Sequence, residues 1–481
     1  MSAAAKLTAA SAQQVSSASE GQVSKLYDPE RDPTLFFRVV KTKSEVYDII
    51  TRAFSRKRGW QELPHGLDLR NSWNFMWSWS KITIDLTKLL IFQKVNHFTG
   101  NKNVSRKDFL KRNIERAQKM SPKANAAFNI MPLSFILPKE YVGFLESFSE
   151  LEDIEGKMNY WIMKPAAKSR GRGIEVINDI SSVIYGEPMV MQRYLKNPLL
   201  LNGFKFDLRI YVLVTSVNPL EMFIYKEGFG RFSTVAYNLD PNDKANKYIH
   251  LTNVSINKHN EKNIENQNAD AIAGGTKVSL DTLKARVEAA YKINWDTQIW
   301  TQIKEVCLKA MVAAQNDMQY NPSCFEVYGF DLIIDADFKL WLLEINSSPS
   351  LARDTVLDDM IKQKMIDDTI SLLDPIDYDR KRLFEVLERR VHEDFSKSSA
   401  GTQNTHTKRQ MNRDLTYILN SKVPRQHGEL PKKLGNYERI APSEASEKYL
   451  KLIGGQKMFG SVMKVSHRPE QNHAVKGKST I

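Results

Sequence analysis

Two carboxylates and an amide oxygen occupy matching positions of a predicted β-hairpin. Residues 329–335 and 340–346 are apolar runs joined by a short polar turn. In an antiparallel pair Asp331 falls opposite Glu344, and Asn346 shares the face of Glu344. Because like charges inside an apolar hairpin are destabilising, we expect a cation between them, and oxygen ligands favour Mg²⁺ with a nucleotide. For an isolated hairpin, charged edge residues facing water are the simpler interpretation, so the rest of the chain must decide.

A basic, glycine-rich loop follows a predicted strand in the middle of the chain. Lys164 ends the strand, and Lys168, Arg170, Gly171 and Gly173 belong to the loop. Glycines let the backbone approach a ligand closely, and backbone N–H groups with Lys and Arg are what a polyphosphate requires. The sequence lacks P-loop, dinucleotide-binding and protein-kinase signatures, which leaves an antiparallel sheet that grips ATP.

A second charged row lies on a predicted apolar strand. Lys205, Asp207 and Arg209 alternate and therefore share one face. Burying such a row is unfavourable unless its members are paired or hold a ligand, and an ion-pair ladder facing water is the alternative. Arg231 follows a glycine-rich hairpin that can reach the same place. Asn253 adds a small polar group, with local capping as its alternative role.

Composition indicates a large globular protein with polar ends. The 481 residues, 42% of them hydrophobic, can bury a core and suggest two or three domains. No apolar run approaches the roughly 20 residues that span a bilayer, so no membrane insertion is expected. Cys307 and Cys324 lack the spacing of a metal site, which fits a reducing, cytoplasmic compartment.

Positive charge is concentrated near the C-terminal end. From residue 380 to 481 there are 21 Lys and Arg against 10 Asp and Glu, an excess of 11 within a net charge of +13. Such an extension usually binds a polyanion, although solubility alone is an alternative reason for it. Because the segment lacks regularly interleaved aromatics, nucleic acid is not the expected partner.

The order of predicted elements gives an α+β fold. We expect a disordered tail over residues 1–32, an N-terminal α/β region over 33–155 and a strand-rich core over 156–375. A basic extension over 376–481 should begin with a helix and then be mostly disordered. The four aromatic residues between 73 and 79 have strand periodicity and are expected in the core.

These parts stand in the order found in ATP-grasp ligases, and four longer motifs resemble the tubulin tyrosine ligase-like family. The motifs cover residues 161–165, 205–214, 250–253 and 342–351, within a resemblance that spans residues 35–375. The resemblance implies an ATP-grasp-like fold. Its antiparallel sheets would grip ATP between a central and a C-terminal subdomain, with a small N-terminal α/β unit beside them.

The resemblance also implies a role for each matching residue. Lys164 and Lys205 would contact ATP. The adenine and ribose contacts would be Gln192, Arg193, Tyr194, Leu195 and Asp207. The Mg²⁺ ligands would be Asp331, Glu344 and Asn346. The residues around the reacting phosphate and acyl groups would be Arg209, Arg231, Asn253 and Glu344.

Within the family, the chain is most similar to the glutamylases. Residues 204–207 and 323–331 are similar to members that place glutamate on side-chain carboxylates, and Arg170 is similar to enzymes that start a glutamate branch. The implied enzyme is an ATP-dependent carboxylate–amine ligase that joins free glutamate to acidic tubulin tails through an acylphosphate. Its basic extension would bind the microtubule. The expected location is the cytoskeleton, with a cilium, flagellum or basal body as further addresses.

Two alternatives stay open. A ligase of the same fold can use another amino acid or a non-tubulin acceptor. The other alternative is a catalytically silent microtubule-binding protein. Such a protein has no physical reason to keep together so many charges whose burial is unfavourable.

Overall fold

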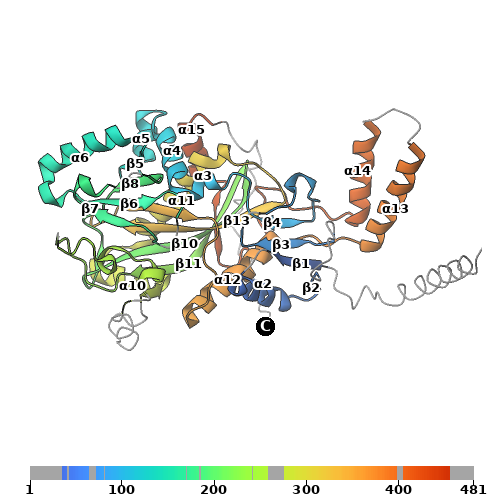
Figure 1. Ribbon diagram of the computed structural model, residues 1–481. Helices are drawn as coiled ribbons and strands as arrows, with labels where there is room; N and C mark the ends of the chain where they lie inside the picture. Colours follow the sequence, from blue (N-terminus) through green and yellow to red (C-terminus); the bar gives the residue numbers. More distant parts are fainter. Residues whose placement is uncertain are drawn as a thin grey trace, which may run out of the picture.

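The fold is built on two β-sheets (Figure 1). The computed structural model describes residues 35–40, 43–63, 72–80, 82–168, 171–183, 186–240, 242–257, 260, 276–397 and 405–455. Its larger sheet has 11 strands, and its smaller sheet has 4 antiparallel strands. The mixed α+β content with antiparallel sheets agrees with the predicted class. The tail predicted over residues 1–32 lies outside the described residues.

Long antiparallel strands form the centre of the large sheet. β10 (Phe204–Val217) pairs with β11 (Leu220–Phe232) and with β13 (Cys324–Ile334), and β13 pairs with β14 (Leu340–Asn346). The predicted hairpin of residues 329–346 is therefore confirmed. Nearly all side chains of β10 and β13 are buried because both faces of the sheet are covered. Alternate residues pack against α11 (Thr301–Ala314) on one face and α12 (Val356–Leu373) on the other.

The N-terminal strands extend this same sheet. They are β1 (Leu35–Val40), β2 (Trp60–Glu62), β3 (Phe75–Ser78) and β4 (Lys94–Asn96), with α2 (Ser44–Ser55) between the first two. β4 pairs in parallel with β13 through Val95 and Cys324. The region predicted as a separate N-terminal unit is thus hydrogen-bonded to the core. The predicted burial of Trp73, Phe75 and Trp77 is confirmed.

The small sheet crosses the boundary predicted at residue 155. Its strands, in spatial order, are β5 (Ser134–Leu137), β8 (Met189–Arg193), β6 (Trp161–Pro165) and β7 (Glu175–Ile177). α6 (Tyr141–Glu155) covers it, with Phe144 packed edge-on against Trp161 at 5.1 Å. Residues on both sides of 155 therefore share one apolar core, which local sequence patterns do not reveal.

Shorter elements complete the two layers. They are α3 (Lys102–Ser105), α4 (Lys107–Gln118), α5 (Pro122–Ala127), β9 (Leu200–Leu201), α7 (Lys247–His250), α8 (Val254–Asn257), β12 (Lys277–Ser279) and α10 (Leu280–Tyr291). β12 pairs with the edge of β11 and ends at Ser279, whose hydroxyl accepts from the Thr282 amide and so begins α10. None of the described helices has the length and apolarity needed to cross a bilayer.

The C-terminal segment differs from the prediction. α13 (Arg380–Lys397) and α14 (Thr405–Ile418) lie side by side and project from one end of the molecule (Figure 1). The chain then returns, and β15 (Tyr437–Ala441) pairs with β11 while α15 (Glu444–Leu452) packs against α11. The expectation of mostly disordered chain after the first helix is therefore wrong for residues 405–455. β15 fills a part of the β11 edge that β12 leaves unpaired, a long-range contact that sequence periodicity cannot show.

A buried carboxylate anchors the returning segment to the large sheet. Glu221 on β11 is fully buried and accepts from Arg425 Nη2 at 2.7 Å and from the Gly428 amide at 2.8 Å. Burial alone would raise the pKa of Glu221, but its bonds with Arg425 and His427 hold this pKa well below the usual range. The carboxylate is therefore ionised at neutral pH, and the anchor is charge-assisted.

Replacing Glu221 with alanine is expected to lower the free energy of unfolding by about 2–3 kcal/mol, because Arg425 and the Gly428 amide lose their acceptor. Denaturant unfolding at pH 7 measures this loss, with exposed Glu152→Ala as the matched control. Since folding lowers the pKa of Glu221, its contribution is present at neutral pH and disappears as the pH falls through the acidic range. Equal losses in the two variants would contradict the anchoring role.

Candidate active site

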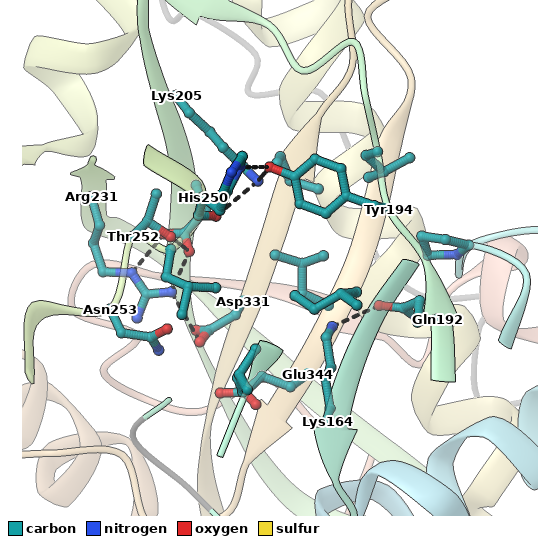
Figure 2. Close-up of a pocket in the computed structure, with 18 of the residues that line it drawn as sticks. Lys164, Gln192, Tyr194, Lys205, Arg231, His250, Thr252, Asn253, Asp331 and Glu344 are labelled. Atoms are coloured by element: carbon teal, nitrogen blue, oxygen red, sulfur yellow. Dashed lines mark hydrogen bonds and ion pairs between the residues drawn. The ribbon is translucent and has the colours of Figure 1, made fainter. Parts of the chain in front are cut away.

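A pocket of about 690 Å³ lies between the small and large sheets (Figure 2). β6 and β8 contribute Lys164 and Gln192, while β10, β11 and β13 contribute Lys205, Arg231 and Asp331. Figure 2 shows these side chains converging on one space from opposite walls. The pocket therefore collects charges from strands that are far apart in the sequence.

Most of the residues predicted for a site meet here. Those on the lining are Lys164, Gln192, Arg193, Tyr194, Leu195, Lys205, Asp207, Arg231, Asn253, Asp331 and Glu344. Arg209 and Asn346 line a larger pocket that adjoins it. Lys168, Gly171 and Gly173 line neither, and Arg170 lies outside the described residues. The side chain of Arg193 bonds to Asn159 at 2.6 Å and ion-pairs with Glu155, which leaves its backbone as the part facing the pocket.

The hairpin carboxylates have the predicted register. Asp331 lies directly opposite Glu344 across β13 and β14. Asn346 Nδ2 donates to Glu344 Oε1 at 3.2 Å, so these two side chains share a face as expected. The repulsion between the carboxylates of Asp331 and Glu344 is reduced, because each of them has its own cationic partners.

Arginines surround Asp331. Arg209 Nε donates to Asp331 Oδ1 at 2.6 Å, and Arg231 Nη2 lies 2.9 Å from Oδ2. Arg231 also forms a bidentate pair with Asp207, with both bonds at 2.6 Å. Burial would raise the pKa of Asp331, but the attraction of Arg209 and Arg231 outweighs it and holds this pKa well below its usual value. The result is a fixed, buried network of alternating charge.

The positive charges of two buried lysines, Lys164 and Lys205, are less well neutralised than those of the arginines. Lys164 Nζ donates to Gln192 Oε1 at 2.6 Å, and Lys205 Nζ donates to the Tyr194 hydroxyl at 2.9 Å and to the His250 carbonyl at 3.0 Å. These acceptors are neutral. Burial, the largest cause, lowers the pKa of Lys164 to about 8 and that of Lys205 to about 7. A bound anion would restore the charged form of both, so this wall suits a phosphate-bearing ligand.

Lys107 is a site residue that sequence reasoning did not identify. It begins α4, and its Nζ lies 3.0 Å from Glu344 Oε2 and 3.1 Å from the Lys168 carbonyl. It therefore joins the hairpin carboxylate to the glycine-rich loop. More than two hundred residues separate Lys107 from Glu344 in the sequence, so no local pattern indicates their contact.

The glycine-rich loop packs close to the first pocket without lining it, whereas its Arg172 lines the larger, adjoining pocket. Gly171 and Gly173 have φ angles of +73° and +70°, which favour glycine. A Cβ on Gly171 would lie 2.4 Å from Ile256 Cδ1 and 3.3 Å from Asn253 Oδ1. Lys168 pairs at 2.8 Å with Glu187, and both side chains are largely exposed. The loop thus covers Asn253, while phosphate contacts from its basic residues stay a prediction.

A second pocket of about 1850 Å³ continues from the first. The two share Arg231, Asn253 and Glu344, so these three residues mark their junction. Its cationic lining residues are Lys43, Arg172, Arg209, Arg231, Lys277 and Lys362. The acidic residues on the same lining are Glu45, Glu344, Asp354 and Asp358, so cations outnumber acids by two.

Comparison with known proteins agrees with this site. The family model described as "Tubulin-tyrosine ligase family" matches residues 84–382, more than half of the chain. A protein of Danio rerio named tubulin polyglutamylase ttll6 is 33% identical over 420 residues, which are 84% of this chain and 50% of the relative. Human tubulin polyglutamylase TTLL13 is 32% identical over 79% of this chain and 46% of its own length. Human tubulin polyglutamylase TTLL5 is 36% identical over 70% of this chain and 26% of its own length.

The fold and the site thus define an ATP-grasp-like α+β protein. The chain belongs to the tubulin-tyrosine ligase family, a family that uses ATP, generally with Mg²⁺. It spans half or less of the length of the relatives described above.

Proposed function

We propose that the chain is an ATP-dependent carboxylate–amine ligase of the tubulin polyglutamylase type. It would join free glutamate to a side-chain carboxylate in the acidic tail of tubulin, through an acylphosphate. The observation that carries this proposal is the junction of the two pockets at Arg231, Asn253 and Glu344. Membership of the family and the names of the relatives support the substrate.

In this proposal the smaller pocket takes ATP between a central and a C-terminal subdomain. Lys164 and Lys205 bind the phosphates, and the backbone at Tyr194 and Leu195 faces the adenine with Gln192 beside it. The ribose contact of Asp207 stays a prediction. Both of its oxygens already accept bonds, from Arg231 and from Thr252, so its first role is to position Arg231.

The hairpin donors fit a divalent cation. Carboxylate and amide oxygens are the ligands that Mg²⁺ prefers, and Glu344 and Asn346 supply them from one face. Asp331 stands opposite Glu344, but both of its oxygens are bonded to Arg209 and Arg231, so it would join these ligands only by releasing one of those bonds. No group of three His, Cys, Asp or Glu that could hold a metal ion occurs among the described residues, so in this proposal the hairpin would hold Mg²⁺ together with the nucleotide. When bound, Mg²⁺ neutralises phosphate charge and orients the triphosphate.

The residues at the junction bring two anions together. The acceptor carboxylate attacks the γ-phosphorus and ADP leaves; the amine of glutamate then attacks the acyl carbon and phosphate leaves. Arg209 and Arg231 face both anions, and the bidentate pairs with Asp331 and Asp207 hold their guanidinium groups in place. Lys107, whose Nζ lies 3.0 Å from Glu344 Oε2, supplies a further positive charge beside the junction.

ATP binding is expected to take up protons and to weaken as the pH rises. The pKa of Lys205 is about 7 in the empty pocket, and a bound phosphate raises it. Below this pH the lysine is already charged; above it, the affinity for ATP falls up to about tenfold per pH unit until the bound-state pKa is reached. Calorimetry in buffers of different ionisation enthalpy measures the protons taken up. Lys205→Met should reduce the uptake, and an unchanged uptake would contradict this assignment.

The proposed function is tested by mass spectrometry of tubulin tails. Purified tubulin is incubated with the protein, ATP, Mg²⁺ and one labelled amino acid at a time. Glutamate is expected to add to tail glutamates only when ATP is present. Incorporation of a different amino acid, or of glutamate into another acidic protein alone, supports the alternative ligase. Absence of any incorporation, with microtubule binding retained, supports the silent binding protein.

The microtubule is the proposed partner of the basic C-terminal segment, which would place the protein on the cytoskeleton. The pair α13 and α14, residues 380–418, carries 9 Lys and Arg against 5 Asp and Glu. The pair projects away from the sheets, where it can reach an acidic surface (Figure 1). A ciliary or basal-body address stays a prediction.

A further inference from the structure

Two lysines lie on the wall of the larger pocket beyond the junction. Lys277 on β12 stands directly opposite Arg231 in the register between β11 and β12. Residues in direct register share a face, and neighbouring strands are about 5 Å apart. Lys362 on α12 lines the same pocket. Lys277 is therefore one strand further from the first pocket than Arg231, and Lys362 lines the same larger pocket from a helix.

Asp358 fixes both lysines. Lys277 Nζ lies 2.5 Å from Asp358 Oδ2, and Lys362 Nζ lies 2.7 Å from Oδ1. Asp358 is completely buried and is held by Thr355, whose hydroxyl donates to Oδ2 at 3.0 Å. The lysine side chains are only 11% and 7% exposed, and both ammonium groups lie over the ring of Phe229. Their positions are thus set by the protein before any ligand arrives.

This cluster has more positive than negative charge. Two ammonium groups share one carboxylate, and Asp354, which also lines the pocket, is exposed at its rim. Burial, the largest cause, lowers the pKa of both lysines, which means that their charged forms are incompletely compensated. Among the described residues Asp358 is the one hydrogen-bond acceptor of Lys277, whose ammonium group has three donors. A second carboxylate would satisfy both the charge and the donors.

We propose that Lys277 and Lys362, fixed by Asp358, bind the side-chain carboxylate of the incoming free amino acid and so select an acidic one. This inference rests on the proposed function. The acceptor carboxylate must reach the γ-phosphate at the junction, whereas any carboxylate of the free amino acid must be kept away from it to escape phosphorylation. A buried cationic recess beside the junction does this and leaves the amine pointing back toward the acyl carbon.

The test compares amino acids as substrates of the full chain. Lys362→Met and Lys277→Met should each lower kcat/KM for glutamate by about 10- to 100-fold, the effect of losing a charge-assisted bond. Incorporation of glutamine should change little, so the preference for glutamate over glutamine falls by the same factor. The KM values for ATP and for the tubulin tail should stay within twofold. Lys364→Met, an exposed lysine on the same helix, is the matched control and should keep the preference.

Each outcome decides the proposal. A preference for glutamate that survives in a variant with normal ATP binding overturns it. An effect confined to the KM for the tubulin tail also overturns it, because the lysines would then bind the acceptor. Should Lys362→Met fail to fold, Lys277→Met on the short edge strand is judged by the same criteria. Failure of the proposed function is a different result, in which the unaltered protein itself incorporates no glutamate.

Discussion

Glu344→Gln is expected to reduce ATP-dependent glutamate incorporation at least about 100-fold while the protein stays folded. The substitution keeps the size of the side chain and its bond from Asn346 but removes the negative charge that faces Lys107 and the proposed cation. Hard divalent cations depend on such charged oxygen ligands. Mass spectrometry of tubulin tails measures incorporation, and thermal unfolding measures the fold.

Its matched control is Glu146→Gln, an exposed glutamate on α6 outside both pockets. That variant should keep activity and stability, the latter within about 0.5 kcal/mol. Near-normal turnover of Glu344→Gln would show that the hairpin carboxylate does not hold the cation. A large loss of stability in Glu344→Gln would instead assign Glu344 to the fold.

Removal of the projecting helices is expected to weaken microtubule binding at low salt at least about 10-fold and to leave ATP binding unchanged. Truncation of everything after residue 379 is unsuitable, because it also removes β15 and α15 from the core. The Asp379 amide donates to the Ile418 carbonyl at 2.9 Å, so a short glycine linker can replace residues 380–417. Co-sedimentation with microtubules measures the affinity. The difference in affinity between the two proteins should shrink as salt rises, because the screening length shortens to about 8 Å at physiological ionic strength.

A charge-reversal variant tests whether microtubule binding depends on the positive charge of the helix pair and not only on its shape. Three exposed cations of the helix pair are replaced with glutamate, namely Lys381, Arg409 and Arg413. The control reverses three exposed lysines elsewhere, namely Lys123, Lys139 and Lys157. Weaker binding only in the first variant supports the helix pair as the contact. Equal microtubule affinity, at low salt, of the complete protein and of the protein without residues 380–417 would exclude the helix pair as the contact.

Local sequence patterns were sufficient to predict the hairpin and the positions of its charged residues. Alternation along the strand predicted that Asp331 faces Glu344, and the register shows this directly. The same periodicity placed Lys205, Asp207 and Arg209 on one buried strand that faces the pockets. These features depend on residues close together in the chain, where the period of two fixes which side chains share a face.

Contacts between segments that are distant in the sequence could not be predicted in this way. Lys107 and Glu344 meet because α4 packs beside the hairpin, and Lys277 meets Lys362 only through the buried Asp358. The return of β15 to β11 depends on an unpaired strand edge. No local pattern contains this information, because a lysine that binds a buried carboxylate looks the same in sequence as one that faces water.

A crystal structure with Mg²⁺ and a non-hydrolysable ATP analogue tests the central claim most directly. The triphosphate is expected between the two sheets, with its γ-phosphate at the junction formed by Arg231, Asn253 and Glu344. Oxygens of Asp331, Glu344 and Asn346 should lie about 2.0–2.1 Å from the metal. A nucleotide bound elsewhere, or a metal without contact to any of these three side chains, would contradict the account.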